Sequence, residues 1–198
     1  MDTVDQHIEI EFKNLLSQED FNKLTNYFNV KESDFILQEN HYFDTPDFAL
    51  KNQKSALRIR VKQGKHELTL KQPARDGLLE SNQQLTPMQA EAFLNGESFP
   101  EGEIQQLLIS VNVNPQQIEF FGTLITSRFE FPYKNGLLVL DHSHYLGTED
   151  FEMEYEALSR SEGQKIFSRL LETLQIPERM TENKVKRFYL QKMKKMSE

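Results

Sequence analysis

Five segments of this chain alternate apolar and charged side chains with a period of two. In the first segment, Ile8, Ile10 and Phe12 are apolar, and the residues between and after them are charged. An extended strand with this pattern has one apolar face and one charged face. The pattern recurs at residues 57–62, 66–72, 126–131 and 150–158. It predicts an antiparallel sheet whose apolar face, including Ile8, Ile10 and Phe12, packs against helices.

Helical patterns lie between and after these strands. Capping residues and apolar stripes predict helices that start after Ser17 and at Thr86–Pro87, and others over residues 100–110, 161–174 and 183–196. The chain is therefore expected to be an α+β protein with helices on one face of a sheet.

The remaining segments complete this outline. Two more strands are predicted at residues 38–44 and 137–141, and residues 73–85 and 142–150 are interpreted as loops. No linker divides the chain, and domains average roughly 150 residues, so residues 1–198 are interpreted as a single domain.

The charge balance restricts the classes of partner. The chain has 31 acidic and 23 basic residues and a net charge of -8, which argues against nucleic acid or an anionic membrane as the partner. It contains no cysteine, which excludes disulfides and cysteine-ligated metals. The polar N-terminus and the lack of an apolar run of 18 residues predict a cytoplasmic protein without a signal peptide.

The charged faces are dominated by arginine and glutamate, which bind phosphates and metal ions well. They are also segregated by sign. The hairpin at residues 57–72 is cationic, whereas the first strand and residues 152–156 are anionic. A sheet that closed into a barrel would have a phosphate-binding wall and a metal-binding wall around a polar lumen. An ordinary sheet with charges paired for solubility would show the same alternation, and the pattern alone leaves both interpretations open.

A series of motifs, in a fixed order along the chain, resembles that of a known protein family. Residues 9–13 (EIEFK) resemble the N-terminal E-x-E-x-K signature of the CYTH superfamily, also called triphosphate tunnel metalloenzymes. The agreement continues in order through His41–Pro46, Ala56–Arg60, Lys71, Arg128, Asp141, Glu152–Glu154 and Asn183–Lys184. The chain is similar to the short, single-domain CYTH proteins of Gram-positive bacteria. The resemblance implies an eight-stranded antiparallel closed β-barrel with a polar lumen and helices outside, binding a triphosphate together with Mg²⁺ or Mn²⁺.

Candidate site residues follow from this resemblance and from the charge that a triphosphate carries. Tripolyphosphate bears about four to five negative charges, so several cations must face it. The expected substrate-binding residues are Lys13, Arg58, Arg60, Lys62, Lys71, Arg128 and Lys184. Among these, Lys13, Arg58, Arg60, Lys71 and Arg128 are expected to act in catalysis.

The candidate metal ligands are carboxylates. Glu9, Glu11, Glu152 and Glu154 are expected to hold a first Mg²⁺ or Mn²⁺, and Asp141 and Glu130 a second one. His142 and His144 form an H-x-H pair that could bind zinc, but the sequence shows no third ligand at a suitable spacing.

Several functions fit these residues. The first is an inorganic triphosphatase that hydrolyses tripolyphosphate, and the alternatives are a class IV-type adenylate cyclase acting on ATP or a thiamine triphosphatase. A further alternative is a module that binds polyphosphate or a nucleotide without turnover. The expected partner is a small-molecule triphosphate, and the protein is expected to be a monomer or a homodimer.

Overall fold

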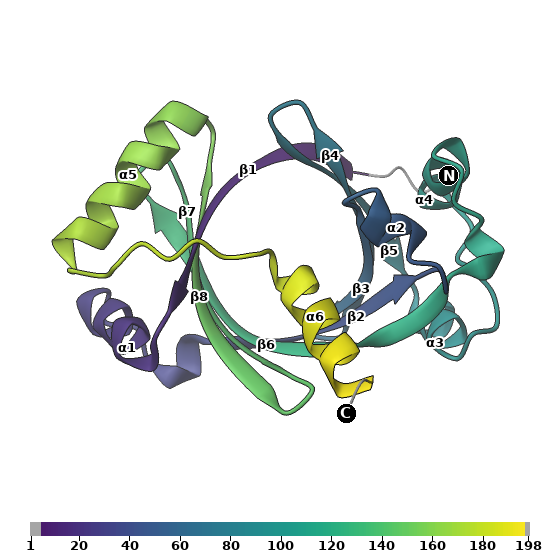
Figure 1. Cartoon of the computed structure of the whole chain (residues 1–198), viewed down its shortest axis with the longest axis horizontal. Helices are drawn as coiled ribbons and strands as arrows, with labels where there is room; N and C mark the ends of the chain where they lie inside the picture. Colours follow the sequence, from purple (N-terminus) through teal and green to yellow (C-terminus); the bar gives the residue numbers. More distant parts are fainter. Residues whose placement is uncertain (1–4, 197–198) are drawn as a thin grey trace. The chain divides into compact units, whose positions relative to one another are not determined.

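The main structural element of this protein is a β-sheet. The structure is a computed structural model that describes residues 5–196. Its strands are β1 (Asp5–Leu16), β2 (Ile36–Asp44), β3 (Ala56–Lys62), β4 (Lys65–Ala74), β5 (Gly77–Leu85), β6 (Glu119–Tyr133), β7 (Gly136–Tyr145) and β8 (Thr148–Ala157). They follow the order β1-β5-β4-β3-β2-β6-β7-β8 in a closed barrel (Figure 1). The hairpin pairings and both pairings of β1 are antiparallel, and the predicted eight-stranded closed barrel is confirmed.

The helices connect or follow these strands. They are α1 (Gln18–Tyr27), α2 (Ala49–Asn52), α3 (Pro87–Leu94), α4 (Glu103–Ser110), α5 (Arg160–Thr173) and α6 (Lys184–Met196), with short 3-10 turns at Glu32–Asp34 and Pro115–Gln117. Within residues 5–196, no helix is both long and apolar enough to span a membrane.

The chain forms two compact units. Unit 1 comprises residues 5–9 and 38–124 of the described chain, and unit 2 comprises residues 10–37 and 125–196. Strands β1, β2 and β6 each contribute to both units.

The core of unit 1 lies on the apolar face of β3 and β4. Leu57 and Ile59 of β3 are fully buried, as are Leu68 and Leu70 of β4, and they form one cluster with residues of α3 and α4. Burial of each such side chain stabilises the fold by about 1.5–3 kcal/mol. Because strand side chains alternate, this packing turns the arginines of β3 to the opposite, charged face.

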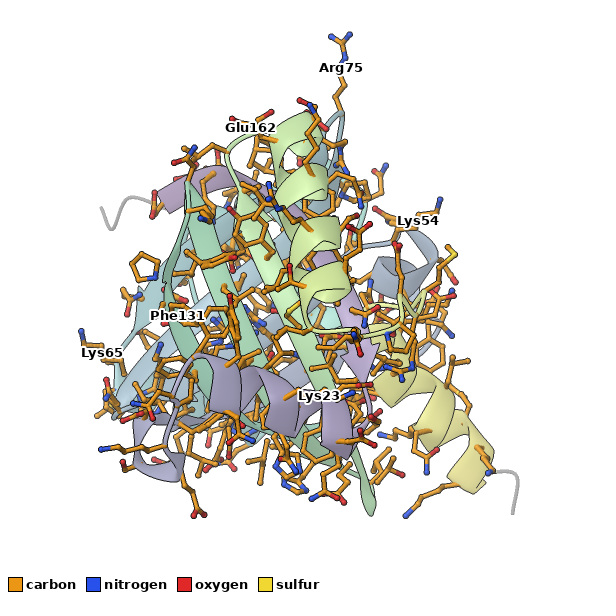
Figure 2. The ribbon with its side chains drawn as sticks, turned by 90° about the vertical axis from the view of Figure 1, so that its left-hand side faces the viewer. Lys23, Lys54, Lys65, Arg75, Phe131 and Glu162 are labelled. Atoms are coloured by element: carbon orange, nitrogen blue, oxygen red, sulfur yellow. The ribbon has the colours of Figure 1, made fainter. Side chains whose placement is uncertain are left out.

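Helices α1 and α5 cover the apolar face of unit 2, where Figure 2 shows them lying across β7 and β8. Phe12 of β1 packs against Phe167 of α5 with ring centroids 5.9 Å apart. The close approach depends on Gly163, since a Cβ there would lie 2.4 Å from Phe12 Cε2 and 2.6 Å from Ala157 Cβ. Met153 and Tyr155 of β8 complete this face, as the alternation predicts.

Two helix starts agree with the predicted caps, and one differs. The Ser17 side chain accepts a hydrogen bond from the backbone N–H of Asp20, and Thr86 forms a capping box with Gln89. Helix α5, predicted to be capped by Ser161, instead follows Ser159, whose carbonyl accepts the first helical hydrogen bond from Gly163 at 2.8 Å.

The interpretation of residues 73–85 and 142–150 as loops is wrong. Residues 77–85 form β5, which pairs with both β1 and β4. In the second segment, residues 142–145 belong to β7 and residues 148–150 to β8. Leu146 and Gly147 form the two-residue turn between them, and their φ values of 49° and 72° suit a tight hairpin. Polar β5 lacks the apolar alternation that marks a half-buried strand, so pairing with its neighbours determines its conformation.

One expectation for β1 also fails. Ile8 was expected to face covering helices together with Ile10 and Phe12, but its side chain is 52% exposed. Ile8 lies in the part of β1 that pairs with β5 in unit 1, opposite Leu79, and not in the part that packs with Phe12.

Candidate functional site

Three carboxylates from neighbouring strands meet in unit 2. Asp141 of β7 lies opposite Glu152 of β8 in the strand register, and Glu154 follows two residues later on the same face. One oxygen of each carboxylate lies within 4.8 Å of the others. The three residues are 0%, 0% and 7% exposed, respectively. The alternation produces this cluster, because Leu140 and Met153 point into the core on the other face.

Arg128 of β6 binds two of these carboxylates. Its Nε and Nη2 donate to Asp141 Oδ1 and Oδ2 at 2.8 and 2.6 Å, and Nη2 also donates to Glu154 Oε2 at 2.8 Å. The register of β6 and β7 places Arg128 directly opposite Asp141. Such a bidentate, charge-assisted pair fixes both side chains in orientation.

Lysines approach the same cluster from β1 and α6. Lys184, at the start of α6, contacts Asp141 and lies 3.2 Å from Glu152 Oε1 and 3.3 Å from Glu154 Oε1. Lys13 of β1 is opposite Glu154 in the register and pairs with Glu11. A lysine at a helix N-terminus is unfavourable for the helix dipole, and the three carboxylates offset this effect.

Further ion pairs, formed by Arg187 of α6 with carboxylates of β8, lie next to this cluster. Arg187 of α6 donates to Glu152 Oε2 at 2.6 Å and to Asp150 Oδ2 at 2.9 Å. The hydroxyl of Tyr145 also donates to Asp150 Oδ2 at 2.7 Å. The sequence interpretation missed Arg187 and Asp150. The spacing of Lys184 and Arg187, three residues apart, puts them on one side of a helix and could have indicated their shared role.

Burial and charge set the protonation of the cluster. Burial alone would raise the pKa of Asp141, but Arg128 and Lys184 outweigh it and lower that pKa. The pKa of Glu154 is lowered in the same way, against burial, by Lys184 and Arg128. Burial raises the pKa of Glu152 to about 7, and the negative charge of Glu154 adds to the effect. Burial by itself would lower the pKa of Lys184, but the three carboxylates raise it.

The donor atoms fit a hard divalent cation. Carboxylate oxygens are the ligands that Mg²⁺ and Mn²⁺ prefer. Two buried oxygens of this region, Glu152 Oε1 and Glu11 Oε1, lie beside lysine ammonium groups but accept no hydrogen bond of good geometry. Buried carboxylate oxygens without hydrogen bonds are costly, and a metal ion would satisfy them.

Unit 1 contains a separate cluster on its charged face. Lys71 of β4 donates to Glu9 of β1 at 2.8 Å and contacts Glu80 of β5, its register partner. Burial would raise the pKa of Glu80, but Lys71 and Arg58 outweigh it and lower that pKa. Glu80 was missed because its strand was interpreted as a loop. Arg60 of β3 donates through Nε to Asn40 of β2 at 3.2 Å.

Three further predicted residues are Lys62, Glu130 and Glu9. Lys62 is half-buried near the end of β3, opposite Lys65 in the register. Glu130 is exposed on β6 and is not one of the three clustered carboxylates. Glu9 pairs with Lys71 in unit 1. The assignments of Glu9, Glu11 and Glu130 as metal ligands therefore stay predictions.

Comparison with known proteins agrees with this arrangement. The model of the CYTH domain family matches residues 7–189. The chain belongs to the CYTH family. A relative from Bacillus subtilis (strain 168), named "Putative triphosphatase YjbK", is 48% identical over 189 residues, which cover 96% of this chain and 98% of the relative.

Solved CYTH-like structures show the same fold. A crystal structure from Bacillus halodurans, named as a putative adenylate cyclase, has a TM-score of 0.90 and 46% identity, covering 93% of this chain and 98% of the other. HpAC1 from Hippeastrum, described as a putative adenylyl cyclase with a dominant triphosphatase activity, has a TM-score of 0.74 at 22% identity, and the match covers 92% of this chain and 95% of HpAC1. At that identity, the likeness extends to the fold alone.

Proposed function

We propose that this CYTH protein is a divalent-metal-dependent triphosphatase that hydrolyses a phosphoanhydride bond of inorganic tripolyphosphate. The observation that carries the proposal is the buried cluster of Asp141, Glu152 and Glu154, bordered by Arg128 and Lys184. The naming of the Bacillus subtilis relative as a putative triphosphatase supports the same reaction class.

Asp141, Glu152 and Glu154 would hold Mg²⁺ or Mn²⁺ through carboxylate oxygens. When bound, the ion neutralises charge on the phosphate oxygens and lowers the pKa of water. Arg128 is fixed by its two hydrogen bonds to Asp141, so its guanidinium is oriented before substrate arrives. Lys184 has a flexible side chain, and it would move from the carboxylates to a phosphate oxygen when the metal binds.

We further propose, from the sequence motifs, that Arg58, Arg60 and Lys71 bind non-bridging phosphate oxygens of the substrate. Arginine forks suit non-bridging phosphate oxygens because two parallel hydrogen bonds can form. Lys62 and Lys13 add positive charge. Phosphoryl transfer depends mainly on positioning and charge neutralisation, and a site built from arginine, lysine and carboxylate side chains provides both.

A second candidate is the cyclisation of ATP to cyclic AMP. It is favoured by the name of the Bacillus halodurans protein, which is 46% identical to this chain. Cyclisation needs a base for the 3′-hydroxyl of ATP and releases pyrophosphate, whereas hydrolysis releases orthophosphate. The products therefore distinguish the two reactions.

The test is a substrate panel. Purified protein is incubated with tripolyphosphate, thiamine triphosphate, ATP or GTP, each with Mg²⁺ and with Mn²⁺, and products are separated by chromatography. We expect orthophosphate release from tripolyphosphate with the highest kcat/KM. Cyclic AMP from ATP would favour the cyclase, and faster turnover of thiamine triphosphate would reassign the substrate.

Variants link the activity to the site. Arg58→Ala and Glu154→Gln should each lower kcat/KM for tripolyphosphate by about 100-fold or more. The first change removes a cation that would stabilise negative charge on the phosphate oxygens, and the second removes a carboxylate that would hold the metal ion. The matched control is Lys54→Ala, because Lys54 is exposed in the turn before β3. A folded wild-type protein that binds tripolyphosphate but turns over none of the four substrates would refute the proposal and identify a binding module.

A further inference from the structure

The turn between β7 and β8 brings together two imidazoles and a carboxylate. His142 and His144 are two residues apart on β7, so they project from the same face of the strand. Glu149 of β8 is the direct register partner of His144. The two-residue turn at Leu146–Gly147 sets this register, and it supplies the third group that the spacing of the chain did not reveal.

The donor atoms of these residues are already close. His142 Nε2 lies 2.8 Å and His144 Nδ1 lies 3.8 Å from the same oxygen of Glu149, Oε2. One ligand atom from each of the three residues lies within 4.8 Å of the others. Ligands at about 2.0–2.1 Å from a tetrahedral ion lie roughly 3.3 Å apart, so small rotations of the side chains suffice.

Aromatic packing holds one imidazole in place. The ring of His142 stacks on Phe151 of β8, with centroids 4.2 Å apart and an angle of 21° between planes, and Phe21 of α1 lies 6.4 Å away. The side chains of His142, His144 and Glu149 are 28%, 50% and 58% exposed. The site therefore combines an anchored ligand with two that can adjust, and it is open to an ion from solvent.

The geometry points to a second metal site at His142, His144 and Glu149, for a divalent transition-metal ion such as Zn²⁺. Two imidazole nitrogens and one carboxylate oxygen suit the borderline ions of this series, whereas Mg²⁺ prefers oxygen ligands alone. Three protein ligands leave a coordination position for water.

This site is distinct from the carboxylate cluster of unit 2. Side chains of neighbouring residues on a strand point to opposite faces, so Asp141 and His142 belong to different faces of β7. On the side of Asp141, Ser143 is buried and forms a hydrogen bond with Thr126. On the other side, His142 meets aromatic rings of β8 and α1. The two sites also differ in chemistry, because the carboxylate cluster offers oxygen ligands alone and the new site offers two imidazole nitrogens and one carboxylate oxygen.

The experiment is a titration of the full-length, tag-free protein with ZnCl₂ by isothermal calorimetry, in excess Mg²⁺ to occupy oxygen-only sites. We expect one Zn²⁺ per chain. His144→Gln and Glu149→Gln should each weaken Zn²⁺ binding by at least about tenfold. The matched control, His66→Gln on β4, should leave binding unchanged. Both altered side chains of the site are half or more exposed, so the variants should fold, which circular dichroism checks.

Spectroscopy identifies the ligands independently. With one equivalent of Cu²⁺, electron paramagnetic resonance should show coupling to two imidazole nitrogens, and His144→Gln should reduce this to one. The inference is overturned if wild-type protein binds Zn²⁺ no more tightly than His144→Gln does. It is equally overturned if Zn²⁺ binding survives in His144→Gln but is lost in Glu152→Gln, because the ion then occupies the carboxylate cluster.

Discussion

Replacement of Asp141 by asparagine should destabilise the fold far more than the loss of one surface charge. Asp141 is fully buried between Arg128, which donates two hydrogen bonds to it, and the ammonium group of Lys184. Asparagine keeps the shape of the side chain and one oxygen. Its amide NH₂ would face a guanidinium or an ammonium group, and neither can accept a hydrogen bond.

The size of the effect follows from the partners left behind. Removing one member of a buried ion pair costs about 3–5 kcal/mol, because the remaining charge is buried without compensation. Glu154 still pairs with both Arg128 and Lys184, so the lower end of that range applies. We therefore expect a loss of about 3 kcal/mol in the free energy of unfolding, which lowers Tm by roughly 6–12 °C for a chain of this length.

Urea denaturation followed by circular dichroism at pH 7, without added metal, measures this loss. At pH 7 the full effect is present, because the lowered pKa of Asp141 keeps it ionised in the folded state and its contribution is lost only as the pH falls through that pKa. The control is Glu119→Gln, an exposed carboxylate on β6, which should change stability by less than about 0.5 kcal/mol.

A double-mutant cycle tests the physical cause. Arg128→Met should also destabilise the protein, but Asp141→Asn combined with Arg128→Met should cost about 2 kcal/mol less than the sum of the two single changes. The reasoning is refuted if Asp141→Asn costs less than about 1 kcal/mol, or if the two changes are additive, because Asp141 and Arg128 would then not be energetically coupled.

Three further predictions address the same fold. Glu152→Gln should become more stable relative to wild type as pH rises from 5 to 7.5, by up to about 2–3 kcal/mol in urea denaturation, because the raised pKa of Glu152 favours its protonated form and its ionisation destabilises the native state. Lys184→Met should tighten Mn²⁺ binding, measured by paramagnetic resonance at pH 8, by about tenfold, since the ammonium group no longer competes for the carboxylates. Gly163→Ala should cost about 1–3 kcal/mol in urea despite its better helix propensity, because the new Cβ overlaps Phe12 and Ala157.

Each of these has a clear contrary outcome. A stability difference between wild type and Glu152→Gln that is constant with pH would show that Glu152 titrates normally. Unchanged Mn²⁺ affinity in Lys184→Met would place the ion elsewhere. For Gly163, the control is Ser161→Ala on the exposed side of α5, and equal effects of the two changes would show that close packing of the helix is unimportant.

The sequence by itself determined which side chains share a face. Leu57 and Ile59 point to the core and Arg58 and Arg60 to the charged face because a strand alternates whatever its neighbours are. The ordered motifs predicted the closed barrel, and Asp141, Glu152 and Glu154 were among the predicted metal ligands. These features depend on local periodicity, or on a pattern spread over the whole chain, and both can be read from residues alone.

Tertiary structure decided which charged residues meet. Glu80 contacts Lys71 only because β5 pairs beside β4, and the polar sequence of β5 lacks the alternation that would have indicated a strand. Arg187 reaches Glu152 through the placement of α6, and Glu149 reaches His144 through the register of one hairpin. Register and helix placement depend on hydrogen bonds and packing between segments that are distant in sequence, so local patterns do not contain them.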